Sequence, residues 1–293
     1  MFEKEIAAVR SFNRRVSSSI GALQDSYLSR GRPLGEARLI FEIGAGGAEI
    51  GAIRGRLGLD SGYCSRLLRS LEAQRLIEIR AVAEDGRRRR ATLTRAGLAE
   101  RDAYDERSEA LAQSLLACLG ESRRARLVAA MGEVERLLRL AAVTIEIQPP
   151  GSADAQSAMR AYFVELAERF EEGFDPEAHD PDGDLDMAPP DGCFLIARLD
   201  GEIVGCGGLK RLDAETGEIK RVWIAPSTRG LGLARRLMSE LEGQARGLGM
   251  TRLCLDTNRA LTEAQRMYRE LGYREIARYN ANPYADHWFE KTF

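Results

Sequence analysis

The sequence predicts two domains of different fold class, a mainly α domain over residues 1–142 and an α/β (α+β) domain over 143–293. A length of 293 residues fits two domains better than one. Residues 1–142 hold 25 Lys and Arg against 19 Asp and Glu, a balance of +6, and residues 143–293 hold 18 against 26, a balance of −8. Helical periodicity dominates the first part, and strands alternate with helices in the second. We therefore expect a polyanion as partner of the first domain and a small or cationic partner for the second.

The first domain begins with helical patterns. Apolar residues at three- and four-residue spacing predict a helix over 2–29, and shorter helices follow over 34–43 and 49–57. The next helix, over 61–73, has Asp60 or Ser61 as its N-cap. A short helix, a tight turn and a second helix form a helix-turn-helix pattern. Its second helix exposes five residues for base and phosphate contacts: Ser61, Tyr63, Ser65, Arg66 and Arg69.

A basic hairpin follows. Residues 76–82 alternate as a strand, Glu84-Asp85-Gly86-Arg87 forms a turn, and 88–93 return as the partner strand. Arginines 87–90 suit contacts with phosphates or a minor groove, and we take Arg87, Arg88 and Arg89 as candidate DNA contacts. A solvated charged turn is the alternative, which the preceding helix-turn-helix makes less favoured.

This region resembles the MarR family of winged-helix regulators over roughly 1–142. The resemblance rests on Gly58-Leu59-Asp60-Ser61-Gly62-Tyr63-Cys64-Ser65-Arg66-Leu67-Leu68, on the Asp85-Gly86-Arg87-Arg88 wing and on Leu93-Thr94-Arg95-Ala96-Gly97. It implies a homodimer on a double-stranded palindromic operator, with residues near 61–69 in the major groove and the wing in the minor groove. Helices expected over 95–118 and 121–141 would join the first helix in the dimer interface; packing within one subunit remains open.

The second domain alternates strands and helices around one glycine turn. Strands are expected over 143–147, 193–199, 202–209, 218–224, 252–256, 273–277 and 287–290, and helices over 152–172, 229–248 and 261–271. Residues 171–191 form an acidic loop or short helix, for which a solvated surface loop is the favoured reading. Together these predict a mixed, mostly antiparallel sheet.

The turn Arg229-Gly230-Leu231-Gly232-Leu233-Ala234 joins a strand to a helix. A helix start leaves backbone N–H groups without partners and carries partial positive charge, so it binds anions. Gly230 and Gly232 let a phosphate approach the backbone closely. We therefore expect a pyrophosphate at this turn. A dinucleotide-binding fold would use such a turn as well, but the preceding strands read as antiparallel hairpins.

The turn and its neighbours resemble the GNAT superfamily of N-acetyltransferases over about 143–293. Glu218–Pro226 precedes the turn, and Leu255-Asp256-Thr257-Asn258 and Ala264-x-x-Met267-Tyr268-x-x-x-Gly272-Tyr273 follow it. The resemblance implies acetyl-CoA as co-substrate, bound between strands that splay near Ile224 and Asp256. It assigns cofactor contacts to Val222, Trp223, Ile224, Arg229, Gly230, Leu231, Gly232, Leu233, Ala234, Arg235 and Asn258. For Asn258 a turn or helix cap is the alternative.

Acetyl transfer to an amine needs a free amine, a polarised carbonyl and a proton for the thiolate. The backbone near Ile224 can polarise the carbonyl. Tyr268 stands where the family places its general acid. The alternative is that Tyr268 only packs in the hydrophobic core. Glu218 stands where some members of the family hold a general base. The alternative is that Glu218 is a solvent-facing residue of the strand. His287 and Trp288 are candidates for shaping the acceptor pocket.

Composition excludes several classes. No stretch approaches 18 apolar residues, and the N-terminus lacks the apolar core of a signal peptide. Five scattered cysteines without C-x-x-C favour reduced thiols and the cytoplasm, and two histidines make a histidine-rich metal site unexpected. We expect a bifunctional regulator and N-acetyltransferase acting on a small molecule or amino acid. The alternatives are a non-catalytic acetyl-CoA or ligand sensor and a protein-lysine acetyltransferase.

Overall fold

The protein is divided into two compact units. The computed structural model describes residues 2–82, 85–171, 173–175 and 184–293. Contacts separate Met1–Ala129 from Ala130–Phe293, so the division falls inside helix α6 (Glu121–Ala142). The sequence places the change of fold class at the end of this helix, at 142/143, and that boundary stays a prediction. Each unit has hydrophobic cores of its own.

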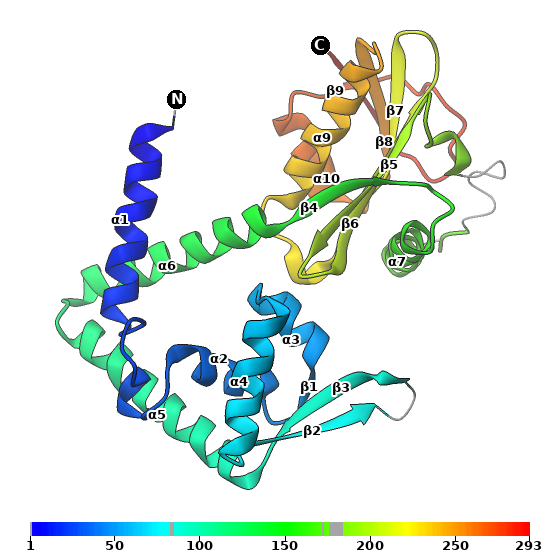
Figure 1. Ribbon diagram of the computed structural model, residues 1–293. Helices are drawn as coiled ribbons and strands as arrows, with labels where there is room; N and C mark the ends of the chain where they lie inside the picture. Colours follow the sequence, from blue (N-terminus) through cyan, green and yellow to red (C-terminus); the bar gives the residue numbers. More distant parts are fainter. Residues whose placement is uncertain (1, 83–84, 172, 176–183) are drawn as a thin grey trace. The chain divides into compact units, whose positions relative to one another are not determined.

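The N-terminal unit is mainly helical and carries a small three-stranded sheet (Figure 1). The strands are β1 (Ala48–Glu49), β2 (Ile77–Val82) and β3 (Asp85–Leu93), in the order β1-β3-β2. Before and between them lie α1 (Glu3–Ser19), η1 (Tyr27–Ser29), α2 (Leu34–Ile43), α3 (Ile50–Leu57) and α4 (Ser61–Ala73), and α5 (Arg95–Ala117) and α6 follow. The predicted helix-turn-helix is confirmed as α3–α4, and the predicted hairpin as β2–β3. The turn was expected over 84–87, but β3 already begins at Asp85, which pairs with Val82.

Two helix boundaries in this unit depend on single residues. Asp60 caps α4, its side chain accepting the Tyr63 N–H at 2.8 Å. The first helix was expected to reach residue 29, but α1 ends at Ser19. Gly21 then adopts φ 68°, and Leu28 and Ser29 also have positive φ, which a right-handed helix cannot contain. The apolar spacing continues past the point where the backbone leaves the helix.

The C-terminal unit is built on a seven-stranded sheet of order β4-β5-β6-β7-β8-β10-β9. The strands are β4 (Thr144–Gln148), β5 (Cys193–Leu199), β6 (Glu202–Arg211), β7 (Thr216–Ile224), β8 (Arg252–Thr257), β9 (Arg274–Ile276) and β10 (His287–Thr292). All neighbouring strands pair antiparallel except β7 and β8, which are parallel. The expected mixed, mostly antiparallel sheet is confirmed.

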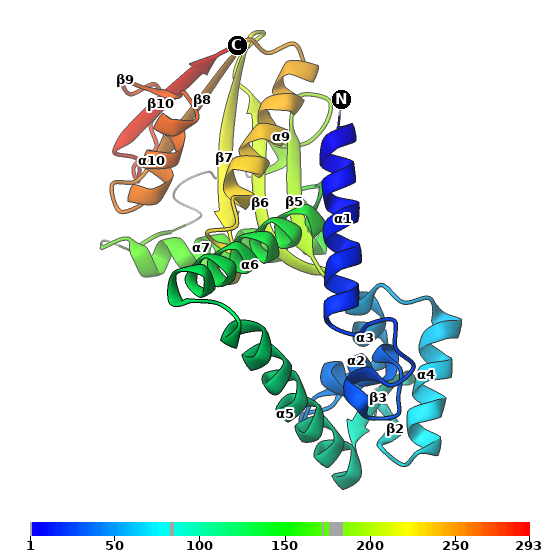
Figure 2. The same ribbon diagram turned by 90° about the vertical axis from the view of Figure 1, so that its left-hand side faces the viewer.

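Helices cover both faces of this sheet (Figures 1 and 2). Helix α7 (Ala153–Arg169) packs on one face, and α9 (Leu233–Gly247) and α10 (Thr262–Glu270) pack on the other. Alternate residues of β5 serve the two faces, since Leu195 belongs to the core under α9 and Phe194 to the core under α7. Two further short turns are η2 (Asp184–Asp186) and η3 (Pro226–Thr228).

Candidate functional site

The two parallel strands of the sheet separate after a short paired stretch. Thr216–Glu218 pair with Arg252–Cys254, and the later parts of β7 and β8 border cavities instead. Opposite β6, the register shifts by one residue between Cys206 and Gly208, where Arg221 adopts φ 57°. A positive φ in a residue other than glycine marks a bulge that bends β7. The predicted splay therefore has a local cause in this bulge.

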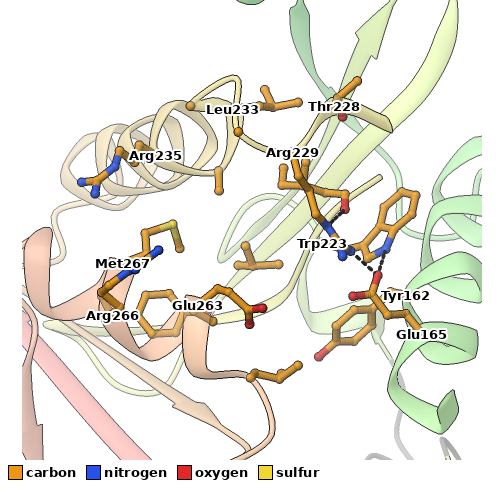
Figure 3. A pocket seen from close by; sticks show the side chains of 18 of the residues that line it. Tyr162, Glu165, Trp223, Thr228, Arg229, Leu233, Arg235, Glu263, Arg266 and Met267 are labelled. Atoms are coloured by element: carbon orange, nitrogen blue, oxygen red, sulfur yellow. Dashed lines mark hydrogen bonds and ion pairs between the residues drawn. The ribbon is translucent and has the colours of Figure 1, made fainter. Parts of the chain in front are cut away.

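A cavity of about 440 Å³ lies beside the end of β7. This volume is in the range of cofactor and ligand pockets. Its walls include nine of the eleven residues predicted to contact the cofactor: Val222, Trp223, Ile224, Arg229, Gly230, Gly232, Leu233, Ala234 and Arg235. Leu231 is buried beneath the turn, and Asn258 lines a neighbouring cavity. The structure thus gathers most of the predicted contacts around one space (Figure 3).

The glycine turn exposes a helix start to this cavity. Gly230 and Gly232 have φ 77° and 89°, and α9 begins only at Leu233. The sequence placed the start at 229, but left-handed glycines cannot belong to the helix. Gly232 is the N-cap of α9, and within the described residues no side chain caps this end of the helix. The first N–H groups of α9 therefore remain available to a ligand. This geometry fits a bound phosphate.

Arg229 is held by a carboxylate of α7. Its Nη2 pairs with Glu165 Oε2, and its Nε donates to the Ile224 carbonyl at 3.0 Å. Trp223 Nε1 donates to the same Glu165 oxygen at 2.9 Å (Figure 3). Glu165 and Tyr162 also line the cavity. The sequence analysis predicted a helix over 152–172 but assigned no role in the site to either residue.

Tyr268 lies in the core and on the cavity wall at once. It is 6% exposed, and its ring lies 6.0 Å from Tyr273 and 5.8 Å from Phe289. Burial raises its pKa well above the ordinary phenol value, and Tyr162 and Asp256 act in the same direction. The phenol therefore stays protonated at neutral pH, as a general acid must. The alternative of a core role is thus observed, and the role of Tyr268 as general acid stays a prediction that its place on the cavity wall allows.

Glu218 is buried away from the cavities. It is 2% exposed and lines neither of the two. Its Oε1 accepts hydrogen bonds from Tyr279 Oη at 2.8 Å and Asn280 Nδ2 at 3.0 Å. Lys210 and Lys220 lie 3.6 Å from its carboxylate. Glu218 is thus satisfied inside a polar network, and its role as base stays a prediction.

A second, smaller cavity of about 70 Å³ adjoins the first. Its polar wall consists of Lys220, Arg221, Asp256, Thr257, Asn258 and Asn282, and its aromatic wall of Tyr162, Phe170, Phe174, Tyr268 and Tyr284. Asn258 also closes a turn, since its Nδ2 donates to the Tyr284 carbonyl and its Oδ1 accepts the Ala260 N–H. The turn-cap alternative for Asn258 is thus observed, and its predicted contact with the cofactor stays a prediction, since Asn258 borders the smaller cavity and not the larger one.

The segment before β10 contributes to this cavity through different residues than expected. The sequence singled out His287 and Trp288. His287 Nδ1 instead lies 2.7 Å from Glu275 Oε1, and Trp288 Nε1 donates to Asn280 Oδ1 at 2.9 Å. Asn282 and Tyr284, earlier in the segment, reach the wall. The cluster of asparagines beside aromatic residues was the available signal.

In the N-terminal unit, α4 shows a buried and an exposed face. Its buried face consists of Cys64, Leu67, Leu68 and Leu71, and all five residues predicted to contact DNA are exposed: Ser61, Tyr63, Ser65, Arg66 and Arg69. The guanidinium of Arg66 lies 5.6 Å from the centre of the Tyr63 ring. The exposed face is therefore polar and carries two arginines.

The hairpin arginines differ in their surroundings. Arg88 binds Glu49 through Nε at 2.9 Å and Nη2 at 2.6 Å, and Arg90 Nη2 donates to the carbonyls of Gly46 and Gly47. Arg89 is exposed. Glu84 and the side chain of Arg87 lie outside the described part of the chain. Arg88, Arg89 and Arg90 are thus all exposed, and contacts with the rest of the unit are observed for Arg88 and Arg90.

The remaining sequence expectations concern metals and membranes. Among the described residues, no group of three His, Cys, Asp or Glu side chains is arranged to hold a metal ion. None of the helices in this part of the chain is long and apolar enough to cross a bilayer. All five cysteines are free thiols, and Cys118 is the exposed one among them.

Comparison with known proteins divides the chain in the same way. The model of the acetyltransferase (GNAT) family matches residues 159–273, and that of the MarR family matches residues 30–88. The first match contains the glycine turn and Tyr268, and the second contains α2 to α4 and the start of the hairpin.

Individual relatives match the C-terminal part. A protein named IAA acetyltransferase from Azospirillum brasilense is 37% identical over 91 residues, 30% of this chain and 59% of the relative. An N-acetyltransferase of Escherichia coli K12, YjgM, is 33% identical over 90 residues, 30% of this chain and 54% of the relative. The chain thus spans under two thirds of either. A solved GNAT acetyltransferase from Staphylococcus aureus Mu50 is 18% identical, with TM-score 0.45, covering 52% of this chain and 99% of that one.

Proposed function

From a chain that joins a MarR family domain to an acetyltransferase (GNAT) family domain, we propose a bifunctional protein. Its C-terminal domain transfers an acetyl group from acetyl-CoA to an amine, a small molecule or amino acid. Its N-terminal domain binds a DNA operator and regulates transcription. Both activities belong in the cytoplasm, which suits five free thiols.

The observation that carries the enzymatic proposal is the position of Tyr268. This buried phenol lines both cavities, so it lies where a cofactor in the larger one would meet an acceptor in the smaller one. The glycine turn would hold the pyrophosphate, and the backbone of Val222–Ile224 the pantetheine. The acceptor nitrogen attacks the thioester carbon, the C–S bond breaks, and Tyr268 donates its proton to the leaving thiolate.

An acetylation screen tests this function. Acetyl-CoA is incubated with a panel of amines, and acetylated products are identified by mass spectrometry. We expect turnover with at least one amine, and Tyr268→Phe should lower kcat about 100-fold or more because it removes the general acid. Binding of acetyl-CoA, measured by calorimetry, should be unchanged. Turnover that survives in Tyr268→Phe would remove the assigned acid.

The DNA-binding proposal rests on α4 and the hairpin. The exposed residues of α4 would enter the major groove, and the hairpin arginines would contact the flanking minor groove. Arg89→Ala should weaken binding and lower the slope of log K against log salt by about 1, because one phosphate contact is lost. Gel shifts at several salt concentrations measure this, with Arg14→Ala, on α1, as control. An unchanged slope would exclude Arg89 from the phosphate contacts.

Homodimerisation is proposed from an exposed apolar stripe on α1. The stripe, called here the α1 stripe, consists of Phe2, Ile6, Val9, Phe12, Val16 and Ile20. Exposed apolar side chains at helical spacing mark an interface with another protein surface. Leu115, Val128, Met131, Leu137 and Leu138 add exposed apolar surface on α5 and α6. A second copy of the chain is the proposed partner.

A ligand-sensing role is the second candidate, and the contacts of two arginines, Arg136 and Arg236, favour it. Arg136 of α6 donates through Nη1 to the carbonyls of Gly230 (3.4 Å) and Leu231 (3.1 Å) in the glycine turn. Arg236 donates to the Leu140 carbonyl at 2.8 Å. Cofactor binding at the turn would therefore act on α6, which begins in the other unit. Gel shifts with and without acetyl-CoA decide, since unchanged operator affinity would remove this role.

The protein-lysine alternative is less favoured. The acidic stretch 171–191 would attract a cationic peptide, and Asp175 and Asp186 belong to its described part, whereas Asp180 and Asp182 lie outside it. A cavity of about 70 Å³ beside Tyr268 suits a single small molecule better than a peptide segment of several residues. A small acceptor is therefore the main proposal.

A further inference from the structure

The two cavities meet along a shared wall. Both are bordered by Tyr162, Leu166, Val222, Leu261, Ala264 and Tyr268. Helix α7 supplies the first two of these and β7 and the α10 region supply the others. A thioester reaching the end of the larger cavity would therefore face directly into the smaller one. An acceptor amine must then be placed by the residues of the smaller cavity.

Asp256 is the carboxylate on the wall of this smaller cavity. Asn280 Nδ2 donates to its Oδ2 at 2.6 Å, and Asn282 Nδ2 donates to its Oδ1 at 2.7 Å. These two amides fix the plane of the carboxylate. Two oxygens offer about four acceptor positions, so two hydrogen bonds leave capacity for a further donor such as an ammonium group.

Asp256 and Glu218 occupy different places in one network. Asn280 Nδ2 also donates to Glu218 Oε1, at 3.0 Å. Lys220 Nζ lies 3.6 Å from Glu218 and 3.8 Å from Asp256. Glu218 is therefore connected to the cavity through Asn280 and Lys220. Of the two carboxylates, Asp256 is the one that borders the smaller cavity.

The rest of the wall describes the body of the acceptor. Lys220 and Arg221 border the cavity, and their positive charge disfavours a second cationic group on the acceptor and favours an anionic one. Phe170, Phe174 and Tyr284, which also border the cavity, form an aromatic cluster, with the ring centres of the last two 4.8 Å apart. Such a wall suits an apolar side chain.

We infer that Asp256 binds and deprotonates the acceptor ammonium, and that the acceptor is an amino acid with an apolar or aromatic side chain. The carboxylate of the acceptor lies toward Lys220 and Arg221, and its side chain lies on the aromatic cluster. This inference rests on the proposed acetyl transfer and names the acceptor and the base of that reaction.

The proton balance follows from these positions. Asp256 takes one proton from R–NH₃⁺, and the free amine attacks the thioester carbon. The N–C bond forms and the C–S bond breaks, while Tyr268 gives its proton to the thiolate of CoA. The nitrogen then loses its second proton, which restores Tyr268, and Asp256 releases its proton to solvent. The net products are the N-acetyl amino acid, CoA and one proton.

The acceptor is tested on the wild-type protein. L-Phenylalanine and L-leucine are compared with phenethylamine and isoamylamine, which lack only the carboxylate, and with spermidine and a lysine peptide. We expect kcat/KM for the amino acids to exceed that of the matched amines about tenfold or more, because only the amino acids carry a carboxylate that the positive charges of Lys220 and Arg221 attract. Equal or greater activity with spermidine or the peptide would overturn the acceptor class.

The base is tested with Asp256→Asn. We expect kcat to fall about 100-fold at neutral pH with an unchanged dissociation constant for acetyl-CoA. As pH rises toward the pKa of the acceptor amine, the activity of this variant should recover about tenfold per pH unit, because the fraction of free amine in solution rises by the same factor. Asp286→Asn is the matched control, since this exposed aspartate lies in the neighbouring segment and borders neither cavity.

The outcomes separate the inference from the function on which it depends. Undiminished activity in Asp256→Asn overturns the inference and leaves acetyl transfer standing. Recovery with pH in Glu218→Gln but not in Asp256→Asn identifies Glu218 as the base instead. No acetylation of any of these amines by wild type, despite bound acetyl-CoA, overturns the proposed function together with the inference. The acceptor comparison uses no variant, so it holds even if a substitution unfolds the protein.

Discussion

At the residue scale, Glu100 shows how one buried charge is stabilised. Arg30 and Arg32 each approach its carboxylate to 2.6 Å, and Glu100 is 7% exposed. The hydrogen bond from Arg30 is the main cause that lowers the pKa of Glu100, and burial opposes it. A carboxylate with a lowered pKa stabilises the fold above its unfolded pKa and loses that contribution as pH falls through the folded value.

The cluster of Glu100 with Arg30 and Arg32 predicts an acid-sensitive N-terminal unit. Glu100→Gln should lower the free energy of unfolding by about 2 kcal/mol at pH 7, because two arginines lose a buried partner. The difference from wild type should shrink below pH 4.5, the ordinary value for glutamate, as wild-type Glu100 becomes protonated. Urea titrations at pH 7 and pH 3.5 measure both, with the exposed Glu106→Gln as control. A difference that does not depend on pH would contradict this account.

At the element scale, the glycine turn depends on backbone conformation that other residues adopt only with strain. Gly232 has φ 89°, and a residue with Cβ costs about 1–2 kcal/mol in the left-handed region. Gly232→Ala should therefore raise the dissociation constant of acetyl-CoA about tenfold, by moving the N–H groups at the start of α9. Calorimetry with acetyl-CoA measures the shift.

The same helix supplies the control. Gly243 lies in the interior of α9 with open space around its Cα, so Gly243→Ala should stabilise the protein by about 0.5–1 kcal/mol and leave acetyl-CoA affinity unchanged. If both variants bind acetyl-CoA like wild type, the turn does not hold the pyrophosphate.

Element types were predictable in this chain because local patterns and sheet packing agree. Alternation and turn residues gave β5 its bounds, 193–199, and the Asp60 cap gave α4 its start. The positions of residues with positive φ were not predicted. Gly21 ends the first helix before residue 29, and Gly232 shifts the start of α9 to Leu233. Apolar periodicity predicts which side chains are buried, but it does not predict where the backbone adopts a left-handed conformation.

At the scale of the whole molecule, the α1 stripe predicts self-association. Val9→Glu with Phe12→Glu places two charges in the stripe, and we expect the dimer to dissociate, because burying unpaired charges is unfavourable. Arg14→Glu is the control, since position 14 lies on the opposite side of the helix. Sedimentation velocity gives the mass of each variant. A wild-type monomer, or a double variant that stays dimeric, would exclude the stripe as the interface.

The sequence by itself determined the two fold classes, the glycine turn as the candidate anion site and Tyr268 as the candidate acid, because these depend on local spacing and residue type. Only the tertiary structure decided which polar residues share a space. Asp256, Asn282 and Lys220 come from distant segments, and the splay of β7 and β8 brings them together at one cavity. The same packing leaves Glu218 buried behind Asn280. Spacing along the sequence does not predict such neighbours, because strand order and side-chain burial determine which residues lie next to each other.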